Sequence, residues 1–433
     1  MSAPTFATGA VPVEPPTPCL PAASSSSCTP TGFEAHALPA GTLHLQVERS
    51  ELPVQQLFVL AARNNPRRAF LFVSRVLAKH LPVAPAVVQD CHERIASRIP
   101  AQFGAQPGPV LFIGMAETAT GLGQGVFDAW QRQHPGAAAL YLHTSRYRAV
   151  GAQALAFEES HSHAPQVFLH LPTDPVLHAQ FVAARSLVLV DDEISTGNTF
   201  VHLAHTCFGQ APHIELVHLA SITVFCGAAR AGLQARMGRP LTTGALLDGA
   251  WTFTPHAPPG HADGAAEAPV APPAQAAQAA PGQEPFFHDS GFGRLGRSGP
   301  VQLAPAAVAQ VAAGITADQQ VLVLGTGEFM HPAFVLARAL QAQTGASVQL
   351  QSTTRSPILP WGPITQTECF ADPYGEGIAN YLYNFTRSDY DHVLLCHETP
   401  PSEVLQALAR RWRARLVHFI SDDCLAQSAF CGP

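Results

Sequence analysis

The clearest chemical signature in the sequence is a pair of adjacent carboxylates at the end of an apolar run. Leu187–Val190 is uniformly apolar and is followed directly by Asp191 and Asp192. Such a run predicts a buried strand, and the carboxyl end of a parallel strand is where an α/β sheet opens towards its ligand. Both aspartates can accept hydrogen bonds from sugar hydroxyls, directly or through the hydration shell of Mg²⁺. We therefore treat them as candidate catalytic and metal-binding residues.

A short polar segment after the acidic pair has the composition of a phosphate-binding loop. Its members are Ser195, Thr196, Gly197, Asn198 and Thr199. The hydroxyl groups are donors, the glycine permits close approach of the backbone, and a helix beginning near Asn198 would present free N–H groups to a phosphate dianion. The alternative is an ordinary strand–turn–helix with a Ser/Thr cap and solvated acids. The spacing between the acidic pair and this loop favours phosphate binding.

A second cluster combines carboxylates with imidazoles. Glu158, Glu159, His161 and His163 lie close together in the sequence. In an extended segment the two histidines would share one face, where they could bind a metal or supply a general base. In a chain with 21 histidines, the alternative is a solvated loop. Glu159, His161 and His163 are kept as candidate catalytic residues.

The elements that must position these groups follow from the alternation of short apolar runs with helical patterns. This alternation predicts a parallel α/β sheet. The expected strands are Thr42–Glu48, Val110–Ile113, Ala138–Leu142, Val167–Leu171, Leu187–Val190, Ile214–Val224, Val321–Leu324, Val348–Gln351 and Val393–Cys396. The expected helices are Val54–Arg63, Ala69–His80, Ala86–Arg98, Gly123–Gln133, a helix from about Asn198, Pro332–Gln343 and Ser402–Trp412.

Composition divides the chain into two domains with flexible flanks. Residues 1–40 are rich in Pro, Ser and Ala and are expected to be disordered, and residues 255–285 have the Ala/Pro-rich composition of a linker. The domains are then residues 41–254 and 286–433. They share a faint repeat, an apolar run followed by Gly, two residues and Glu, which ends at Glu117 and again at Glu328. A degenerate duplication would explain it, although any two α/β units look alike at this level.

Charge and cysteine content exclude several classes of protein. The net charge is −7, which leaves no basic surplus for general nucleic-acid binding. The nine cysteines are scattered without a C-x-x-C pair, which argues against a disulfide framework and a zinc site and favours a reducing cytoplasm. The sequence shows neither a secretory signal nor an apolar run long enough for a membrane span.

The segment Leu187–Thr199 resembles the signature of type I phosphoribosyltransferases. The resemblance implies that Asp191 and Asp192 bind the ribose hydroxyls of phosphoribosyl pyrophosphate (PRPP) and that the following loop binds its 5-phosphate. The family also has a pyrophosphate-binding loop after an earlier strand, and its place is taken here by Met115, Ala116, Glu117 and Thr118. Glu117 departs from that pattern, because a carboxylate beside pyrophosphate is useful only through Mg²⁺ or a substrate amine, unless it caps the next helix.

An arginine after a further strand end would complete such a site. Arg146 follows a predicted strand and could neutralise pyrophosphate with its planar fork, the alternative being an ordinary surface arginine. Arg355 occupies the equivalent place in the second domain. There Gly325–Glu328 lacks the third glycine of a dinucleotide fingerprint, and Pro400 and Pro401 remove N–H donors from the turn after His397 and Glu398. A second PRPP phosphate loop is therefore not expected.

The wider pattern is similar to a narrower group of proteins, in which a phosphoribosyltransferase domain is followed by a TRSP domain in bacterial gene clusters associated with tellurite resistance. The namesake motif stands here as Thr354–Pro357. Other resembling stretches are Asn65–Arg68, Phe70–His80, Glu158–His163, Gly325–Phe329 and Tyr374–Gly377. The resemblance implies a PRPP-using enzyme and a possible homodimer, and it supplies no acceptor.

The reaction implied is displacement of pyrophosphate from C1 of PRPP by a nitrogenous nucleophile, with Mg²⁺ as cofactor. Catalysis would come mainly from positioning and from stabilising the departing pyrophosphate. The reverse reaction, pyrophosphorolysis of a nucleotide, is an alternative. A regulator that binds PRPP or a nucleotide without turning it over is a third possibility, and the second domain could also be a protein-interaction module.

Overall fold

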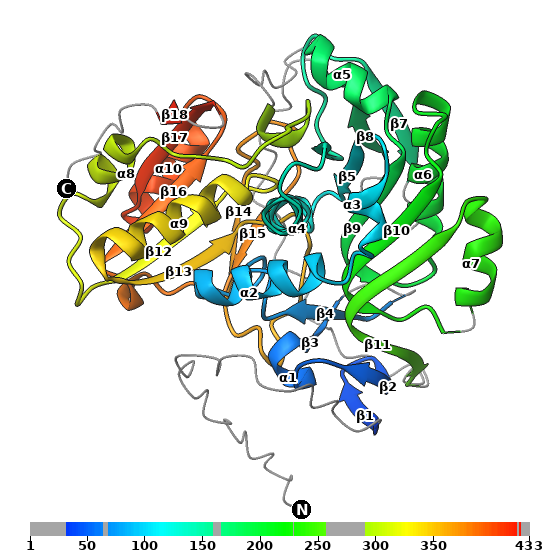
Figure 1. Ribbon diagram of the computed structural model, residues 1–433. Coiled ribbons are helices and arrows are strands. Elements are labelled where there is room, and N and C mark those ends of the chain that lie inside the picture. The colour runs from blue at the N-terminus through cyan, green and yellow to red at the C-terminus, as the bar shows by residue number, and fades with distance from the viewer. Residues whose placement is uncertain are drawn as a thin grey trace, which may run out of the picture.

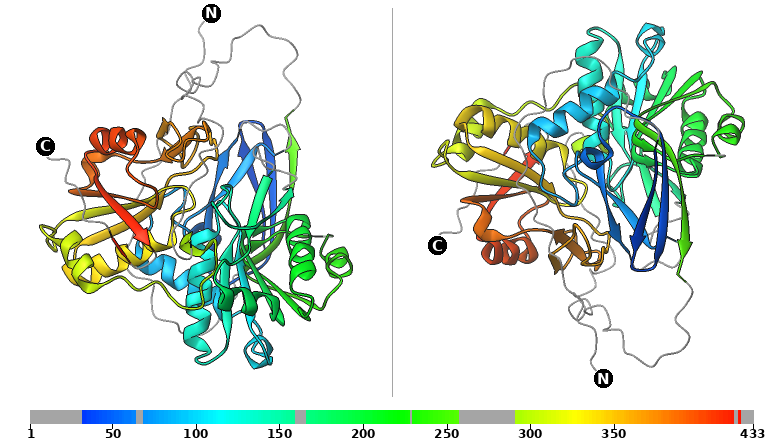
Figure 2. Two further views of the ribbon diagram at one scale, coloured as in Figure 1. Left: turned by 90° about the horizontal axis from the view of Figure 1, so that it is seen from above. Right: turned by 90° about the horizontal axis from the view of Figure 1, so that it is seen from below.

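A computed structural model describes residues 32–63, 68–158, 166–227, 229–256, 291–421 and 424–425. Within these ranges the chain forms two α/β units that lie side by side (Figures 1 and 2). We call residues 32–256 the first half and residues 291–425 the second half. None of the helices in the described ranges combines the length and hydrophobicity that a bilayer-spanning segment needs.

The first half is built on a seven-stranded sheet with the order β1-β2-β11-β10-β9-β5-β6. The five strands from β11 to β6 are parallel, and a β1–β2 hairpin adds antiparallel to β11. The strands of this sheet are β1 (Gly32–Leu38), β2 (Gly41–Ser50), β5 (Val110–Gly114), β6 (Ala139–His143), β9 (Ser186–Ile194), β10 (Leu216–Val224) and β11 (Leu241–Pro255). Two separate hairpins are β3 (Phe58–Ala62) with β4 (Phe70–Ser74), and β7 (Ala154–Glu158) with β8 (Gln166–His170).

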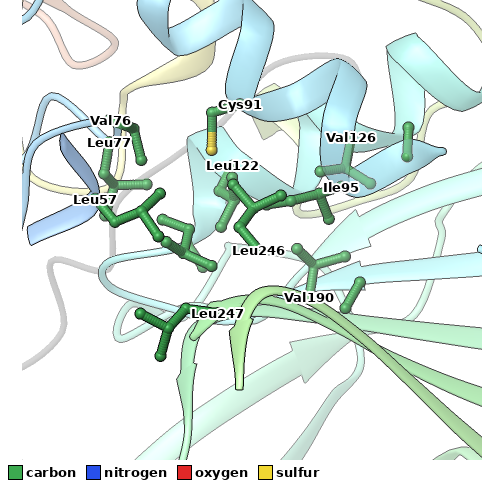
Figure 3. Close-up of a cluster of buried hydrophobic side chains, with 14 of the residues drawn as sticks. Leu57, Val76, Leu77, Cys91, Ile95, Leu122, Val126, Val190, Leu246 and Leu247 are labelled. Carbon is green, nitrogen blue, oxygen red and sulfur yellow. The ribbon is translucent and has the colours of Figure 1, made fainter. Parts of the chain in front are cut away.

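Helices cover both faces of this sheet. The helices of the first half are α1 (Val54–Leu57), α2 (Pro85–Ala96), α3 (Gln102–Ala105), α4 (Thr120–Gln133), α5 (Pro175–Val182), α6 (Asn198–Gln210) and α7 (Ala229–Met237). Because side chains alternate along a strand, Val190 of β9 joins the buried cluster of α2 and α4, while Leu189 faces the cluster that contains α6. Figure 3 shows Cys91 and Ile95 of α2 in the first of these clusters. The apolar strand runs of the sequence are thus buried on both faces.

The second half repeats the central part of the first. Its five-stranded sheet has the order β13-β12-β16-β17-β18, so β13-β12-β16-β17 corresponds to β6-β5-β9-β10 in order and in parallel direction. An antiparallel hairpin, β14–β15, follows β13 along the chain just as β7–β8 follows β6. The faint sequence repeat is therefore matched by a repeated order of elements.

The elements of the second half are shorter on average but follow the expected spans. Its strands are β12 (Gln320–Gly325), β13 (Ser347–Ser352), β14 (Thr367–Phe370), β15 (Asn380–Tyr383), β16 (His392–His397), β17 (Arg415–Ser421) and β18 (Cys424–Leu425). Its helices are η1 (Gly291–Gly293), α8 (Pro305–Ala312), α9 (His331–Thr344), η2 (Arg387–Asp389) and α10 (Glu403–Trp412).

Two of the expected helices were wrong. Val54–Arg63 forms only the single turn α1 before continuing as β3, and Ala69–His80 begins with strand β4. Phe58, Phe70 and Phe72 of this hairpin form edge-to-face ring pairs and lie in the core beside the main sheet. Packing of these aromatic side chains has overridden a local pattern that also fits a helix.

The expected disordered tail was too long. Gly32–Leu38 forms β1 and pairs residue by residue with β2, so the prediction of disorder was wrong for residues 32–40. Burial of Leu38 against the core stabilises this pairing. Residues 1–31 lie outside the described residues. The same holds for the expected linker, apart from Pro255, which ends β11, and His256.

Candidate active site

The acidic pair lies at the carboxyl end of the central strand of the first half. β9 runs between β5 and β10, and its Val190 pairs with Gly114, the last residue of β5. Asp191 and Asp192 therefore extend past the end of β5, while β10 continues beside them, with Ser221 opposite Asp191. This position is the sheet edge at which ligands of open α/β folds bind. The strand continues to Ile194, four residues further than the apolar run alone indicated.

The surroundings of the acidic pair disfavour the ionised form of Asp192. Asp191 accepts a hydrogen bond through Oδ1 from the backbone N–H of Asp192 at 2.9 Å. Burial raises the pKa of Asp192, and the negative charge of Glu193 acts in the same direction against the hydrogen bond with Asp191. A hydroxyl donor or a cation bound here would offset this cost.

The phosphate loop, residues Ser195–Thr199, leads directly into α6. Gly197 is the N-cap of α6 with φ of 73°, and a Cβ there would lie 2.6 Å from Cδ1 of Leu233. Gly197 has no side chain that could cap the helix, but Oγ1 of Thr196 accepts a long hydrogen bond of 3.4 Å from the N–H of Asn198, so the alternative of a Ser/Thr cap is met only in part. The N–H groups of its first turn are thus directed towards the loop, where a phosphate dianion would accept their hydrogen bonds.

Two arginines that the sequence analysis did not select contact this region. Arg236 of α7 donates to the carbonyl of Thr196 at 2.9 Å and also to the side chain of Asn198. Arg68 donates to Oε2 of Glu193 at 2.7 Å. Neither has a local sequence signal, because each reaches the site through the packing of a separate element. Their positive charge suits a phosphorylated ligand.

The candidate pyrophosphate loop, Met115–Thr118, joins β5 to α4 beside the acidic pair. The N–H of Met115 donates to the carbonyl of Val190 at 2.9 Å, and the N–H of Ala116 donates to Oγ1 of Thr144 at 2.8 Å. The predicted alternative of a helix cap for Glu117 was wrong, since the N-cap of α4 is Ala119 and carries no side-chain cap.

Glu117 instead forms an ion pair with Lys79. Its carboxylate lies 2.8 Å from the Lys79 ammonium, and the two side chains are 12% and 1% exposed. Burial opposes the charge, yet the attraction and hydrogen bond of Lys79 lower the pKa of Glu117 to about 2. The departure from the family pattern at Glu117 is thus compensated by a cation from a distant part of the chain.

Of the remaining candidate residues, Arg146 belongs to the described part of the chain and the other three do not. Arg146 is partly buried after β6, and its positive charge contributes to the low pKa of Glu117, while its predicted role towards pyrophosphate stays a prediction. Glu159, His161 and His163 lie outside the described residues, and their predicted roles stay predictions.

The donor set of the site is compatible with Mg²⁺ bound together with a phosphorylated ligand. Mg²⁺ keeps several waters and takes one or two carboxylates plus substrate oxygens. Asp191 and Asp192 supply such carboxylates, and within the described ranges no group of three or more His, Cys, Asp or Glu side chains is arranged to hold a metal by itself. The residues therefore fit a cation that arrives with its ligand.

The chain shows limited likeness to solved structures of known enzymes. Adenine phosphoribosyltransferase from Thermoanaerobacter pseudethanolicus is 12% identical, with 44% of this chain and 96% of that chain covered and a TM-score of 0.29. The enzyme from Saccharomyces cerevisiae is 10% identical, with 44% and 97% covered and a TM-score of 0.28. That from Trypanosoma brucei is 11% identical, with 45% and 78% covered and a TM-score of 0.30. No curated protein matches the chain.

Family models match most of the chain in two consecutive parts. The model described as phosphoribosyl transferase matches residues 57–250, which contain the whole candidate site. The model described as the TRSP domain C-terminal to that domain matches residues 292–410. Each matched range lies within one of the two α/β units of the structure. The chain therefore belongs to the proteins in which a phosphoribosyl transferase domain is followed by a TRSP domain.

Proposed function

We propose that the protein is a phosphoribosyltransferase that uses PRPP and Mg²⁺ and transfers the phosphoribosyl group to a nitrogenous acceptor, or catalyses the reverse pyrophosphorolysis. The observation that carries this proposal is the juxtaposition, at the carboxyl end of β9, of the acidic pair with the start of α6 at Gly197. An acidic pair suits ribose hydroxyls, and a helix start suits a phosphate dianion. PRPP carries both groups a few bonds apart.

Each part of the site has a role in this reaction. Asp191 and Asp192 would hold the ribose hydroxyls, and the phosphate loop with Arg236 would hold the 5-phosphate. When bound, Mg²⁺ neutralises charge on the pyrophosphate leaving group and is held in part by the two aspartates. The pyrophosphate loop and Arg146 lie where the leaving group would depart. Fixing the 5-phosphate supplies binding energy that orients C1 for attack.

The first experiment is titration calorimetry of PRPP with Mg²⁺ on the wild type and on Asp191→Asn and Asp192→Asn variants. Charge-assisted hydrogen bonds contribute about 1.5–3 kcal/mol, so each substitution should weaken PRPP binding by about tenfold or more. A matched control is Asp174→Asn. Asp174 caps α5 through hydrogen bonds from Val176 and Leu177, and asparagine caps a helix equally well, so PRPP binding should not change.

The outcomes separate the candidate functions. Binding that depends on the aspartates, followed by pyrophosphate release when nitrogenous acceptors are screened, supports the transferase. Binding without release in any screen would instead favour a PRPP-binding regulator. A folded wild type that does not bind PRPP refutes the proposal.

A further inference from the structure

The loops at the carboxyl ends of the two sheets are built alike. In the first half, the N–H of Ala116 donates to Oγ1 of Thr144 at 2.8 Å. In the second half, the N–H of Gly327 donates to Oγ1 of Thr353 at the same distance of 2.8 Å. Gly114 and Gly325 end corresponding strands and are paired in register with the neighbouring strands. Glu117 and Glu328, three residues after these glycines, are therefore structural equivalents.

The two halves use these equivalent glutamates to bind each other. Glu328 accepts a hydrogen bond from the backbone N–H of Arg146 in the first half, at 2.6 Å. Glu117 accepts one from the backbone N–H of Arg355 in the second half, at 3.3 Å. Arg146 and Arg355 are themselves equivalents, each two residues after the paired threonine. Such exchange of equivalent contacts is the pattern of a two-fold subunit interface, formed here within one chain.

The equivalence ends at the cations that neutralise these glutamates. In the second half the buried guanidinium of Arg294 binds Glu328 at 2.8 Å and also Glu398 at 2.7 Å. Glu398 occupies the place that Asp192 has in the first half, two residues beyond the strand residue paired with the glycine. The carboxylate of Glu398 is therefore already bound by a side chain of the protein, the guanidinium of Arg294. Among the described residues, no cationic side chain forms an ion pair with Asp192.

In the first half, the cation that neutralises the equivalent glutamate, Glu117, is Lys79. Its ammonium binds Glu117 at 2.8 Å and donates to the carbonyl of Gly327 in the second half at 2.7 Å. Lys79 is the one lysine in the sequence, against 23 arginines. A compact ammonium can direct separate donors to a carboxylate and to a carbonyl, which differs from the fixed planar fork of arginine. The position is thus chemically specific and connects the pyrophosphate loop with the second half.

We propose that the second half is the built-in partner of the transferase half and that Lys79, fixed between Glu117 and the Gly327 carbonyl, positions the pyrophosphate loop. The proposal rests on the function proposed above. It assigns the second half a role without a ligand of its own, since Arg294 closes the equivalent acidic position. Lys79 is buried and acts on pyrophosphate through the loop, so it is a positioning residue rather than a catalytic one.

A single lysine permits a direct test on the full-length wild type. Protein labelled with ¹³C at the lysine ε-carbon gives one Lys79 signal in an NMR spectrum. Addition of pyrophosphate or PRPP with Mg²⁺ should shift this signal, whereas ribose 5-phosphate, which does not reach the loop, should leave it in place. A lysine with a purely structural role would respond to none of the three. An unchanged signal in a wild type that binds PRPP overturns the proposal while leaving the proposed function intact.

Variants test both sides of the contact by calorimetry. Lys79→Met should weaken binding of pyrophosphate and PRPP by about tenfold, as loss of a charge-assisted hydrogen bond does, and should retain the affinity for ribose 5-phosphate. Arg185→Met is the matched control, because Arg185 forms an exposed ion pair with Glu215 at the opposite end of β9. Wild-type affinity for pyrophosphate in Lys79→Met overturns the role of Lys79.

The second half is tested by Gly327→Ala. Gly327 has φ of 56°, so alanine strains the backbone that presents the carbonyl to Lys79. Gly314→Ala is the control, because Gly314 also has a positive φ of 84° and nothing lies within 4 Å of the added Cβ. Weaker pyrophosphate binding in Gly327→Ala alone supports the proposal, and equal binding in both variants overturns the contribution of the second half. A wild type that does not bind PRPP overturns both proposals, and this outcome is visible before any variant is measured.

Discussion

Gly197 is the residue of the phosphate loop whose replacement has the most predictable consequence. Its φ of 73° lies in the left-handed region, where a residue with a Cβ costs about 1–2 kcal/mol. The added Cβ would also lie 2.6 Å from the Cδ1 of Leu233, a buried side chain of α7. Displacing a packed side chain costs about 1 kcal/mol more. Gly197→Ala therefore carries a strain of about 2–3 kcal/mol within the loop.

Relieving this strain requires a shift of the loop or of the Leu233 side chain. If the loop stays in place, the free energy of unfolding falls by the full amount, which urea denaturation measures. If it moves, the N–H groups at the start of α6 leave the phosphate position and the affinity for PRPP falls, by about tenfold for each 1.4 kcal/mol relieved in this way. The losses in stability and in binding should therefore add up to about 2–3 kcal/mol.

Gly209→Ala is the matched control in the same helix. Gly209 has no positive φ, is exposed near the end of α6, and has nothing within 4 Å of an added Cβ. Alanine there should stabilise the protein by about 0.5–1 kcal/mol and leave PRPP binding unchanged. The reasoning is refuted if Gly197→Ala unfolds like the wild type and also binds PRPP like the wild type.

Three further outcomes are expected. Arg236→Ala should weaken ribose 5-phosphate and PRPP by about tenfold each and leave pyrophosphate unaffected in calorimetry, because the guanidinium of Arg236 donates to the phosphate loop at Thr196 and Asn198; a selective loss of pyrophosphate binding would contradict this. Glu117→Gln should reduce the free energy of unfolding by about 3 kcal/mol at neutral pH, since it breaks a buried ion pair. Because folding lowers the pKa of Glu117 to about 2, the difference from the wild type should persist above pH 4.5 or so and disappear as the pH falls towards 2, which urea denaturation across this range tests. Light scattering of the full chain should give the mass of a single chain at micromolar concentration, since the pairing that two subunits would supply is formed within it; a stable dimer would count against the built-in partner.

The sequence predicted the central strands β5 and β9 and the turn that precedes α6 because these depend on local patterns. The apolar runs Val110–Ile113 and Leu187–Val190 are buried on both faces of a parallel sheet, and such burial leaves a continuous signal. The left-handed turn at Gly197 likewise requires a residue type that the sequence displays directly. Both lie within a few residues of the chemistry that they support.

Two cations near the site, Arg236 and Lys79, could not be predicted in this way. Arg236 reaches Thr196 across 40 residues, and Lys79 reaches Gly327 across 248 residues. No periodicity connects such positions, since their proximity depends on how whole elements pack. The sequence therefore left several roles possible for Glu117, whereas the structure pairs it with Lys79. The β3–β4 hairpin was mistaken for helix for a related reason, because its ring pairs with the main sheet decide its conformation.

An edge strand of each sheet pairs through its backbone with a segment of the other half. Tyr141 in the edge strand β6 exchanges backbone hydrogen bonds of 2.7 and 2.8 Å with Arg297, which precedes the second sheet. Leu350 in the edge strand β13 does the same with Val83, which precedes α2 in the first half, at 2.8 and 2.9 Å. An uncovered edge strand would offer its N–H and C=O groups to another chain. Since each half covers the edge of the other, their association is intramolecular and does not depend on protein concentration. Arg294 can then bind Glu398 in the second half while the contact through Gly327 still fixes Lys79 and Glu117.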